Sequence, residues 1–478
     1  MEGPPGGVPS DRSAKLAFMM LRINILIPTL ILSFFSAESQ KLNKTDKITL
    51  ANLQAHVRYL SDDKLEGRRM GAPGEKAASD YIISELSKAG IQPKGDNNGW
   101  LQAFTIDQGR EVSADAYFTV DDRPLLLNRE WFPLALSPAG LLTGSPAIAL
   151  QESGVPWFLD LKDLTEMGAG SAHFDLPGAI RAKAVACAKK GATALILYNS
   201  SSRYPDKLSF DPKDRPQAAV IPVLYITREA KKKYLKDESA SVDLRIRIGF
   251  TERQRTGHNV VGYLDNGAAT TVIIGAHYDH LGHGEDSAVN QPPPPSVGKA
   301  VYNGANDNAS GVAAMLELSR LLAASKLRNN NYLFIAFSGS ELGWFGSGYF
   351  AGHPVMDLKK SNYMIDMEMI GRLNDTTHTL TIGGYSTSPA WASLCNSAND
   401  KKSFTLLYDS SGKGPGDYAA FYRKEIPVLF FSTGPYPDFH QPGDDYDKIN
   451  YPGELQVLKF IYALIEGTNT RGRVGFAP

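Results

Sequence analysis

The sequence predicts an α/β fold, a three-layer sandwich of helices around a mostly parallel mixed β-sheet, with a smaller inserted domain of mixed α and β structure. After Gly257, apolar strand-like runs alternate with helical segments, which is the pattern of βαβ units. From about 112 to 248 the strand-like runs are shorter and only one helix is clear. A length of 478 residues also exceeds one ordinary domain.

The first elements expected along the chain are helices. Apolar residues recur at helical spacing at 50–60 and at 74–86, and the whole stretch 48–105 is interpreted as helical. In the middle stretch, an Ala-rich helix at 178–191 ends at a glycine. We expect buried strands to follow it at 192–198 and 221–226.

The segment after Gly257 carries the predicted sheet. We expect its strands at 271–276, 331–337, 363–369 and 426–431, and its helices at 311–324 and near 454–465. Sheets of this kind bind ligands at the carboxyl ends of their strands. Residues that directly follow these strands are therefore the first candidates for a functional site.

Composition and charge exclude several classes of protein. The formal net charge of −1 argues against a nucleic-acid-binding protein and against a polybasic membrane protein. The apolar content of 42% and charged content of 21% are those of a globular chain. Cys187 and Cys395 are the only cysteines, so a thiolate zinc site is excluded and a disulfide framework is not expected.

The amino terminus predicts an exported protein. Residues 1–39 are interpreted as a signal peptide, because the apolar run at 23–35 follows Arg22 and is short for a membrane span. A start at Met19 or Met20 would make residues 1–18 a misassigned extension. The alternative is an uncleaved anchor. We expect a periplasmic or extracellular protein with no stable membrane insertion after cleavage.

Metal-type side chains follow the predicted strands or lie in loops near them. Imidazole and carboxylate groups suit zinc, and two ions that share a bridging carboxylate need about this set of residues. Taken singly, a histidine after a strand is more often a packing residue than a metal ligand, and an aspartate before a helix is more often its N-cap. Their joint occurrence in this order favours a metal site. The candidates are His277, Asp307, Glu341, Glu368 and His440.

Two motifs, His-Tyr-Asp-His-Leu-Gly at 277–282 and Asn-Asp-Asn-Ala-Ser-Gly at 306–311, resemble the zinc aminopeptidase family that includes aminopeptidase Y and the bacterial leucine aminopeptidases. The resemblance covers nearly all of the mature chain. It implies a zinc exopeptidase-like domain at 40–111 and 249–478, with a protease-associated domain inserted at 112–248. The partners it implies are the amino termini of peptides or proteins.

The resemblance also implies a role for each candidate residue. One or two zinc ions would be bound, with His277 and Glu368 as terminal ligands of one ion. Glu341 and His440 would hold the other ion, and Asp307 would bridge both. Asp279 would orient the His277 imidazole from behind, as such partners do.

The sequence departs from the family pattern at several positions. Ser340 stands where the family has its general-base glutamate, and losing such a base typically costs ~10²–10⁴ in rate. Glu368 replaces the usual aspartate, and Gly-Pro-Gly-Asp-Tyr at 414–418 occupies a loop that often reads Ser-Asp-His in the family. Asp366 is a conceivable substitute carboxylate, although structural pairing explains it better. Ser340 lacks the Gly-x-Ser-x-Gly elbow of a serine nucleophile.

These observations leave more than one function open. The first is an exported aminopeptidase-type exopeptidase, with activity reduced or absent because of Ser340. The alternative is a pseudopeptidase that keeps a metal or peptide pocket for binding. A third possibility is a cyclase or transferase on the same scaffold. Those enzymes also need an acidic base, so Ser340 counts against this possibility as well.

Overall fold

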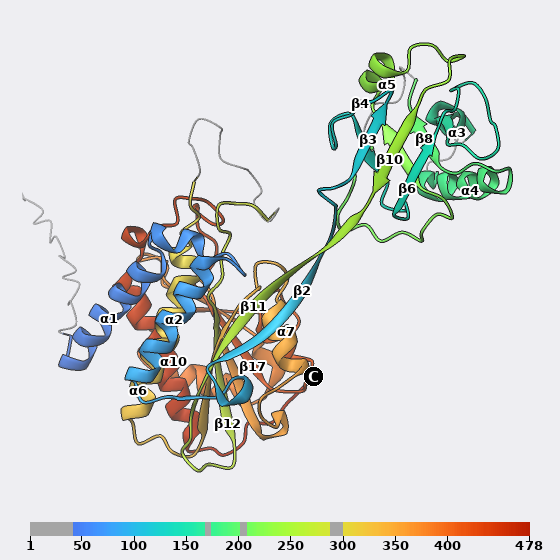
Figure 1. Cartoon of the computed structure of the whole chain (residues 1–478). Helices are drawn as coiled ribbons and strands as arrows, with labels where there is room; N and C mark the ends of the chain where they lie inside the picture. Colours follow the sequence, from blue (N-terminus) through green and yellow to red (C-terminus); the bar gives the residue numbers. More distant parts are fainter. Residues whose placement is uncertain (1–41, 168–173, 201–207, 287–299) are drawn as a thin grey trace, which may run out of the picture. The chain divides into compact units, whose positions relative to one another are not determined.

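The structure is a computed structural model that describes residues 42–167, 174–200, 208–286 and 300–478 (Figure 1). The predicted signal peptide at 1–39 lies outside the described residues. In the described part of the chain, no helix has both the length and the apolar character needed to cross a bilayer. Cys187 and Cys395 are both buried and unpaired.

The main body is built on a nine-stranded mixed sheet. Its order is β1–β11–β13–β12–β14–β17–β15–β16, and β2 also pairs with β11. Strands β13, β12, β14 and β17 are mutually parallel, whereas β11 and β15 join this centre in antiparallel fashion. The strands are β1 Gln92–Pro93, β2 Leu101–Val112, β11 Phe250–Leu264, β12 Thr271–His277, β13 Asn331–Phe337, β14 Ser361–Met367, β15 Thr379–Gly383, β16 Thr405–Tyr408 and β17 Val428–Ser432.

Helices cover both faces of this sheet. Along β12, Val272 and Ile274 join one hydrophobic core while Ile273 joins another, as alternation along a strand requires. The first core includes residues of α1 Lys44–Leu60, α2 Pro73–Lys88, α6 Gly311–Ala324, α8 Trp391–Ala398 and α10 Tyr451–Asn469. The second includes α7 Phe345–Gly352 and α9 Tyr418–Tyr422. The predicted three-layer α/β sandwich is confirmed.

Residues between β2 and β11 form two further four-stranded sheets, and no strand described there pairs with the nine-stranded sheet. The two sheets share one hydrophobic core, which includes Phe118 and Ile246 of one sheet and Ile196 and Leu224 of the other. A second core draws on the latter sheet alone. One has the order β4–β3–β10–β6 and the other β5–β9–β8–β7. The elements are β3 Tyr117–Val120, β4 Arg123–Pro124, β5 Trp131–Pro133, β6 Gly140–Gly144, β7 Trp157–Asp160, α3 Leu161–Met167, α4 Leu176–Lys189, β8 Leu195–Tyr198, β9 Val223–Ile226, α5 Arg228–Tyr234 and β10 Leu244–Ile248. That they form a separate protease-associated domain stays a prediction.

The helical interpretation of 48–105 is wrong at its carboxyl end. Leu101–Val112 is a strand that pairs with β11 over most of its length. Gln102, Phe104 and Ile106 are buried while Ala103 and Thr105 between them are exposed, which is a period of two rather than a helical period.

Candidate metal centre

The predicted site residues come from the carboxyl ends of parallel strands. His277 is the last residue of β12, Ser340 and Glu341 follow β13, and Glu368 follows β14. Asp307 lies in a short π-helical turn, Ala305–Ser310, directly before α6. His440 lies in the loop after β17 with φ 54°, a left-handed conformation that is costly for a residue with a side chain. Parallel pairing of β13, β12 and β14 therefore places these residues at one edge of the sheet.

Four of the five predicted ligands are in mutual contact. The distance between His277 Nε2 and Asp307 Oδ1 is 3.3 Å, and that between His440 Nε2 and Asp307 Oδ2 is 3.2 Å. His440 Nε2 also lies 3.3 Å from Glu341 Oε2. Asp307 thus stands between the two imidazoles, each facing a different carboxylate oxygen.

These separations suit zinc. Ligand atoms bound 2.0–2.2 Å from one tetrahedral zinc ion lie about 3.3–3.6 Å apart. The observed contacts are close to that tetrahedral edge length, and the donors are imidazole nitrogens and carboxylate oxygens. The residues present therefore fit a zinc ion, with Asp307 able to offer one oxygen to each of two ions.

Glu368, the fifth predicted ligand, lies among other acids, and its charge acts on His277. Ligand oxygens of Glu368, Asp366 and Asp417 lie within 4.8 Å of one another. Glu368 Oε1 is buried and has no hydrogen-bond partner among the described residues, which is unusual for a native carboxylate and leaves this oxygen able to bind a cation. Burial, followed by the charge of Asp366, raises the pKa of Glu368 well above its usual range.

The contacts between these residues shift their pKa values toward the charged forms of His277, His440 and Asp307. Burial works to lower the pKa of His277, but its hydrogen bond to Asp307 and the charge of Glu368 raise that pKa well above its ordinary value. His440 behaves in the same way, with its pKa raised to about 10. Hydrogen bonds from both imidazoles lower the pKa of Asp307 despite its burial. A cation at this place would take over the role of the imidazole protons, because it carries the same sign of charge.

Asp279 holds two parts of the centre, in a different way from that expected. His277 Nδ1 lies 3.2 Å from the backbone oxygen of Asp279 and 3.8 Å from its carboxylate. The carboxylate instead accepts hydrogen bonds from the backbone N–H groups of Ser340, at 3.1 Å, and Glu341, at 3.3 Å. Asp279 therefore orients the imidazole through its carbonyl and fixes the turn after β13 through its side chain.

Ser340 points at a carboxylate. Its hydroxyl donates a 2.7 Å hydrogen bond to Asp417 Oδ2, and Asp417 is fully buried. The other oxygen, Asp417 Oδ1, has no partner among the described residues. Asp366, considered from the sequence as a substitute carboxylate, accepts a hydrogen bond from the Tyr418 backbone at 2.9 Å. The contact with Ser340 is made by Asp417.

The sequence interpretation assigned no role to three residues at this centre. His280 Nδ1 lies 2.7 Å from Glu341 Oε1, and Asp444 accepts hydrogen bonds from the backbone N–H groups of Asn306 and Asp307. Arg68 is buried and donates to the carbonyl oxygens of Leu60, Tyr278, Asn303 and Gly304. His280 lies within the quoted motif and Asp444 near His440, so their positions were a usable signal. Nothing in the sequence marked Arg68.

The chain is similar to known proteins over part of its length. Residues 259–465 match the model of peptidase family M28. Aminopeptidase YwaD from Bacillus subtilis is 28% identical over 273 residues, which are 54% of this chain and 53% of YwaD. The chain thus matches about half of the length of that relative. Leucine aminopeptidase 2 from Trichophyton rubrum is 25% identical over 209 residues, 41% of this chain and 37% of the relative.

Solved structures are similar at lower identity. BSAP, a zinc aminopeptidase from Bacillus subtilis, has a TM-score of 0.48 and 19% identity, and the match covers 89% of this chain and 95% of BSAP. An aminopeptidase from Aneurinibacillus sp. strain AM-1 has a TM-score of 0.49 and 20% identity over 91% of this chain and 96% of its own. The family match spans the strands that supply the centre. Residues 259–465 of this chain belong to peptidase family M28.

Proposed function

We propose that this chain is an exported, zinc-dependent exopeptidase of the aminopeptidase type, which hydrolyses the first peptide bond of peptides or proteins. The observation that carries the proposal is the contact of Asp307 with both His277 and His440 at distances that match the edges of a zinc coordination tetrahedron. The aminopeptidases among its relatives support the same activity. The apolar run near the amino terminus supports export.

The residues divide the work as follows. His277, Asp307, Glu341, Glu368 and His440 would hold one or two zinc ions. Zinc, when bound, supplies a Lewis acid that polarises a carbonyl and acidifies water. Asp279 fixes the tautomer of His277, because its carbonyl oxygen can only accept a hydrogen bond, which keeps the proton on Nδ1 and leaves Nε2 free to bind metal.

This chain differs from the family pattern at the general base, where Ser340 stands in place of a glutamate. Ser340 cannot take a proton at neutral pH by itself, because a hydroxyl is too weak a base. Asp417 is one hydrogen bond away, so a carboxylate still lies beside position 340. We propose that Asp417 acts through or beside Ser340 and supports slow hydrolysis.

The test is hydrolysis of a panel of amino-terminal amide substrates by the zinc-loaded chain, compared with Ser340→Glu and Asp417→Asn. We expect slow turnover by the natural chain, an increase of ~10²–10⁴ in Ser340→Glu, and loss of the slow turnover in Asp417→Asn. A chelator should abolish all of these activities. Silence of both the natural chain and Ser340→Glu, with zinc shown to be bound, would overturn the proposal.

A second candidate function rests on Ser340 itself. A serine at the base position is what a pseudopeptidase would carry, one that binds a metal or a peptide without cleaving it. If the natural chain is silent but Ser340→Glu is active, the scaffold is intact and this second function is the better one.

A further inference from the structure

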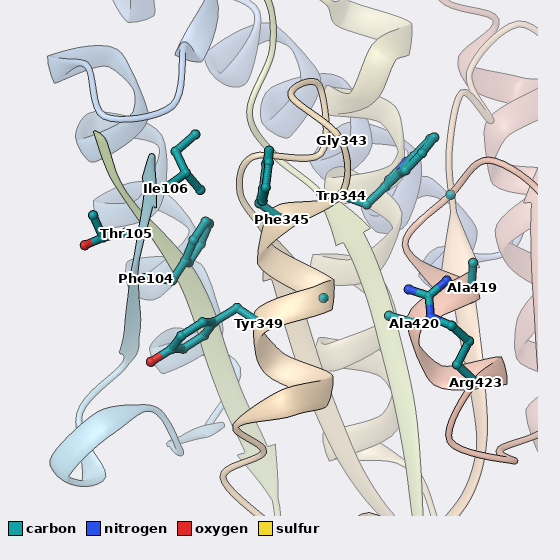
Figure 2. A pocket seen from close by; sticks show the side chains of 12 residues that line it. Phe104, Thr105, Ile106, Gly343, Trp344, Phe345, Tyr349, Ala419, Ala420 and Arg423 are labelled. Carbon is teal, nitrogen blue, oxygen red and sulfur yellow. The ribbon is translucent and has the colours of Figure 1, made fainter. Parts of the chain in front are cut away.

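A cavity lies on the face of the sheet that α7 and α9 cover. Its volume is about 330 Å³, within the usual range for small-ligand pockets. Aromatic and apolar side chains line it: Phe104 and Ile106 of β2, and Trp344, Phe345 and Tyr349 at and within α7 (Figure 2). Arg423, at the end of α9, is the charged residue among those that line it.

This cavity adjoins the metal centre. One of its walls contains Gly416, the residue before Asp417, and another contains Gly343, two residues after Glu341. A Cβ atom placed on Gly416 would lie 3.5 Å from Glu368 Oε1. A molecule held at the centre can therefore extend past Gly416 into the cavity.

Trp344 is held in a costly position. Its φ is 57°, in the left-handed region, and such a conformation costs on the order of 1–3 kcal/mol for a residue with a side chain. Its side chain is nevertheless 42% exposed, and that of Phe345 is 43% exposed. The tight turn from Ser340 fixes this conformation, since Trp344 N donates to the Ser340 carbonyl at 3.1 Å and the Trp344 carbonyl accepts from Gly348 N at 3.0 Å and from Ser347 Oγ at 3.2 Å. The turn thus holds two aromatic rings exposed at the cavity, as a surface that a ligand can cover.

Arg423 is a cation without a partner. It is exposed, and among the described residues its guanidinium makes no hydrogen bond, ion pair or ring contact, whereas Lys413 lies over the ring of Tyr422. Figure 2 shows its side chain running back along α9 past Ala420 and Ala419, on the side of the cavity where Trp344 lies. An arginine fork matches a carboxylate better than any other peptide group.

We propose that this cavity is a substrate pocket, in which Trp344 and Phe345 cover an aromatic or large apolar residue of a short peptide and Arg423 binds a carboxylate of that peptide. The inference rests on the proposed exopeptidase function, because the substrate of that function supplies the peptide. The carboxylate has two sources, the free carboxyl terminus of the peptide or an acidic side chain.

The length of α9 limits where that carboxylate lies. Asp417 and Arg423 are six residues apart with right-handed helical backbone at both ends, which is about 9 Å along a helix axis. This length is an upper limit for the guanidinium, because the Arg423 side chain runs back along α9. An extended peptide covers about 3.3–3.6 Å per residue. The carboxylate therefore lies within two or three residues of the group held beside Asp417, which selects dipeptides, tripeptides and peptides with an early acidic residue.

The experiment measures binding, so that it does not depend on turnover. The zinc-loaded full chain is titrated with Ala-Phe-Ala, its carboxyl-terminal amide, and Ala-Phe-Asp amide, using quenching of tryptophan fluorescence. Trp344→Phe identifies the part of the signal that comes from Trp344. Arg423→Gln is the test variant and Lys424→Gln is its matched control, since Lys424 is the exposed neighbouring cation and does not line this cavity.

We expect a peptide with a carboxylate to bind roughly 3- to 10-fold more tightly than one without, as a charge-assisted contact at a partly exposed site allows. Arg423→Gln should remove that preference and Lys424→Gln should keep it. Tighter binding of Ala-Phe-Ala alone identifies the carboxyl terminus as the source, and tighter binding of Ala-Phe-Asp amide alone identifies a side chain.

Equal binding of all three peptides to the natural chain, or equal effects of Arg423→Gln and Lys424→Gln, overturns the proposal. If the chain prefers peptides with a carboxylate but hydrolyses none, the proposed activity is refuted and the proposed pocket is kept. If it hydrolyses peptides without that preference, the pocket is refuted and the activity is kept.

Discussion

At the scale of single residues, the centre depends on side chains that touch no substrate. Asp279 shows this best, because one fully buried residue positions His277 through its carbonyl and the Ser340–Glu341 turn through its carboxylate. Burial raises the pKa of Asp279 to about 8. A bound cation nearby would favour its ionised form and strengthen both backbone hydrogen bonds.

Asp279→Asn should weaken zinc binding about 10- to 100-fold, which is typical for loss of a residue that orients a ligand. The amide keeps one acceptor, but its NH₂ group meets a backbone N–H that needs an acceptor. Competition with a chelating indicator measures the affinity. The exposed Asp265→Asn is the control, and unchanged affinity in Asp279→Asn would contradict the role given to the carboxylate.

Asp286 gives a pH-dependent prediction away from the centre. Arg255 and Arg69 each bond to both of its oxygens, at 2.7–2.9 Å and 2.8–3.0 Å. Burial opposes ionisation, but these hydrogen bonds lower the pKa of Asp286 to about 2. A lowered folded-state pKa means that the stabilisation is present above the unfolded pKa of about 3.9 and is lost as the pH falls toward the folded value.

Asp286→Asn should therefore lower the free energy of unfolding by about 1–2 kcal/mol at pH 7, after allowance for solvent screening. The difference from the natural chain should shrink between pH 5 and pH 3. Urea unfolding at each pH measures both. Glu285→Gln, whose carboxylate lies 3.8 Å from Arg69 and is more exposed, should change stability much less. A difference that grows at low pH would refute this sign.

The candidate ligands could be predicted from the sequence because each follows a strand or lies in a motif. Asp417 was recognised only as part of an altered loop, and its bond to Ser340 could not be predicted. These two residues are 77 positions apart, and they meet because α9 packs on the same face as the turn after β13. Contacts that depend on how two elements pack leave no local pattern in either element.

At the scale of elements, the turn after β13 is fixed by how closely α7 approaches it. Gly346 N donates to the Ser338 carbonyl at 3.0 Å, and Asn259 Nδ2 donates to the Gly346 carbonyl at 2.9 Å. A Cβ atom on Gly346 would overlap the Ser338 carbonyl oxygen and Asn259 Oδ1. Glycine at this position is therefore what lets α7 begin directly beside the metal centre.

Gly346→Ala should lower the free energy of unfolding by about 1–3 kcal/mol, because the backbone must move to admit the methyl group. Gly352→Ala is the matched control in the same helix, since no atom lies within 4 Å of a Cβ placed there. It should be neutral or stabilising by up to about 1 kcal/mol. Thermal unfolding of both variants tests this, and equal effects would show that the close approach at Gly346 is not what constrains α7.

The predicted elements differ in how well they were located. The predicted ends of α6 and β13 coincide with the observed ones, because their buried runs are long and bounded by polar residues. Strand β2 was missed, since the alternating pattern of Leu101–Val112 is short and follows two genuine helices. The strand is stabilised by pairing with β11, whose residues lie far along the chain.

At the scale of the whole molecule, metal binding, protonation and stability are linked. The pKa of His277 is raised well above its ordinary value and that of His440 to about 10, so a proton and a cation compete for each imidazole. Zinc binds neutral imidazoles, so its binding must release the protons of both histidines. Below these pKa values, the affinity for zinc should therefore rise with each pH unit by up to about tenfold for each proton released. Because zinc binds only the folded chain, saturation at 100 times Kd should add about 2.7 kcal/mol of stability.

The zinc-induced rise in Tm at fixed zinc concentration should therefore be larger at pH 8 than at pH 6, and a chelator should reverse it. His277→Ala removes one of the two protons and should reduce the pH dependence of zinc affinity by about one unit of slope, whereas the exposed His353→Ala should leave it unchanged. A zinc-induced shift that is equal or smaller at pH 8 would show that these imidazoles do not exchange protons for metal.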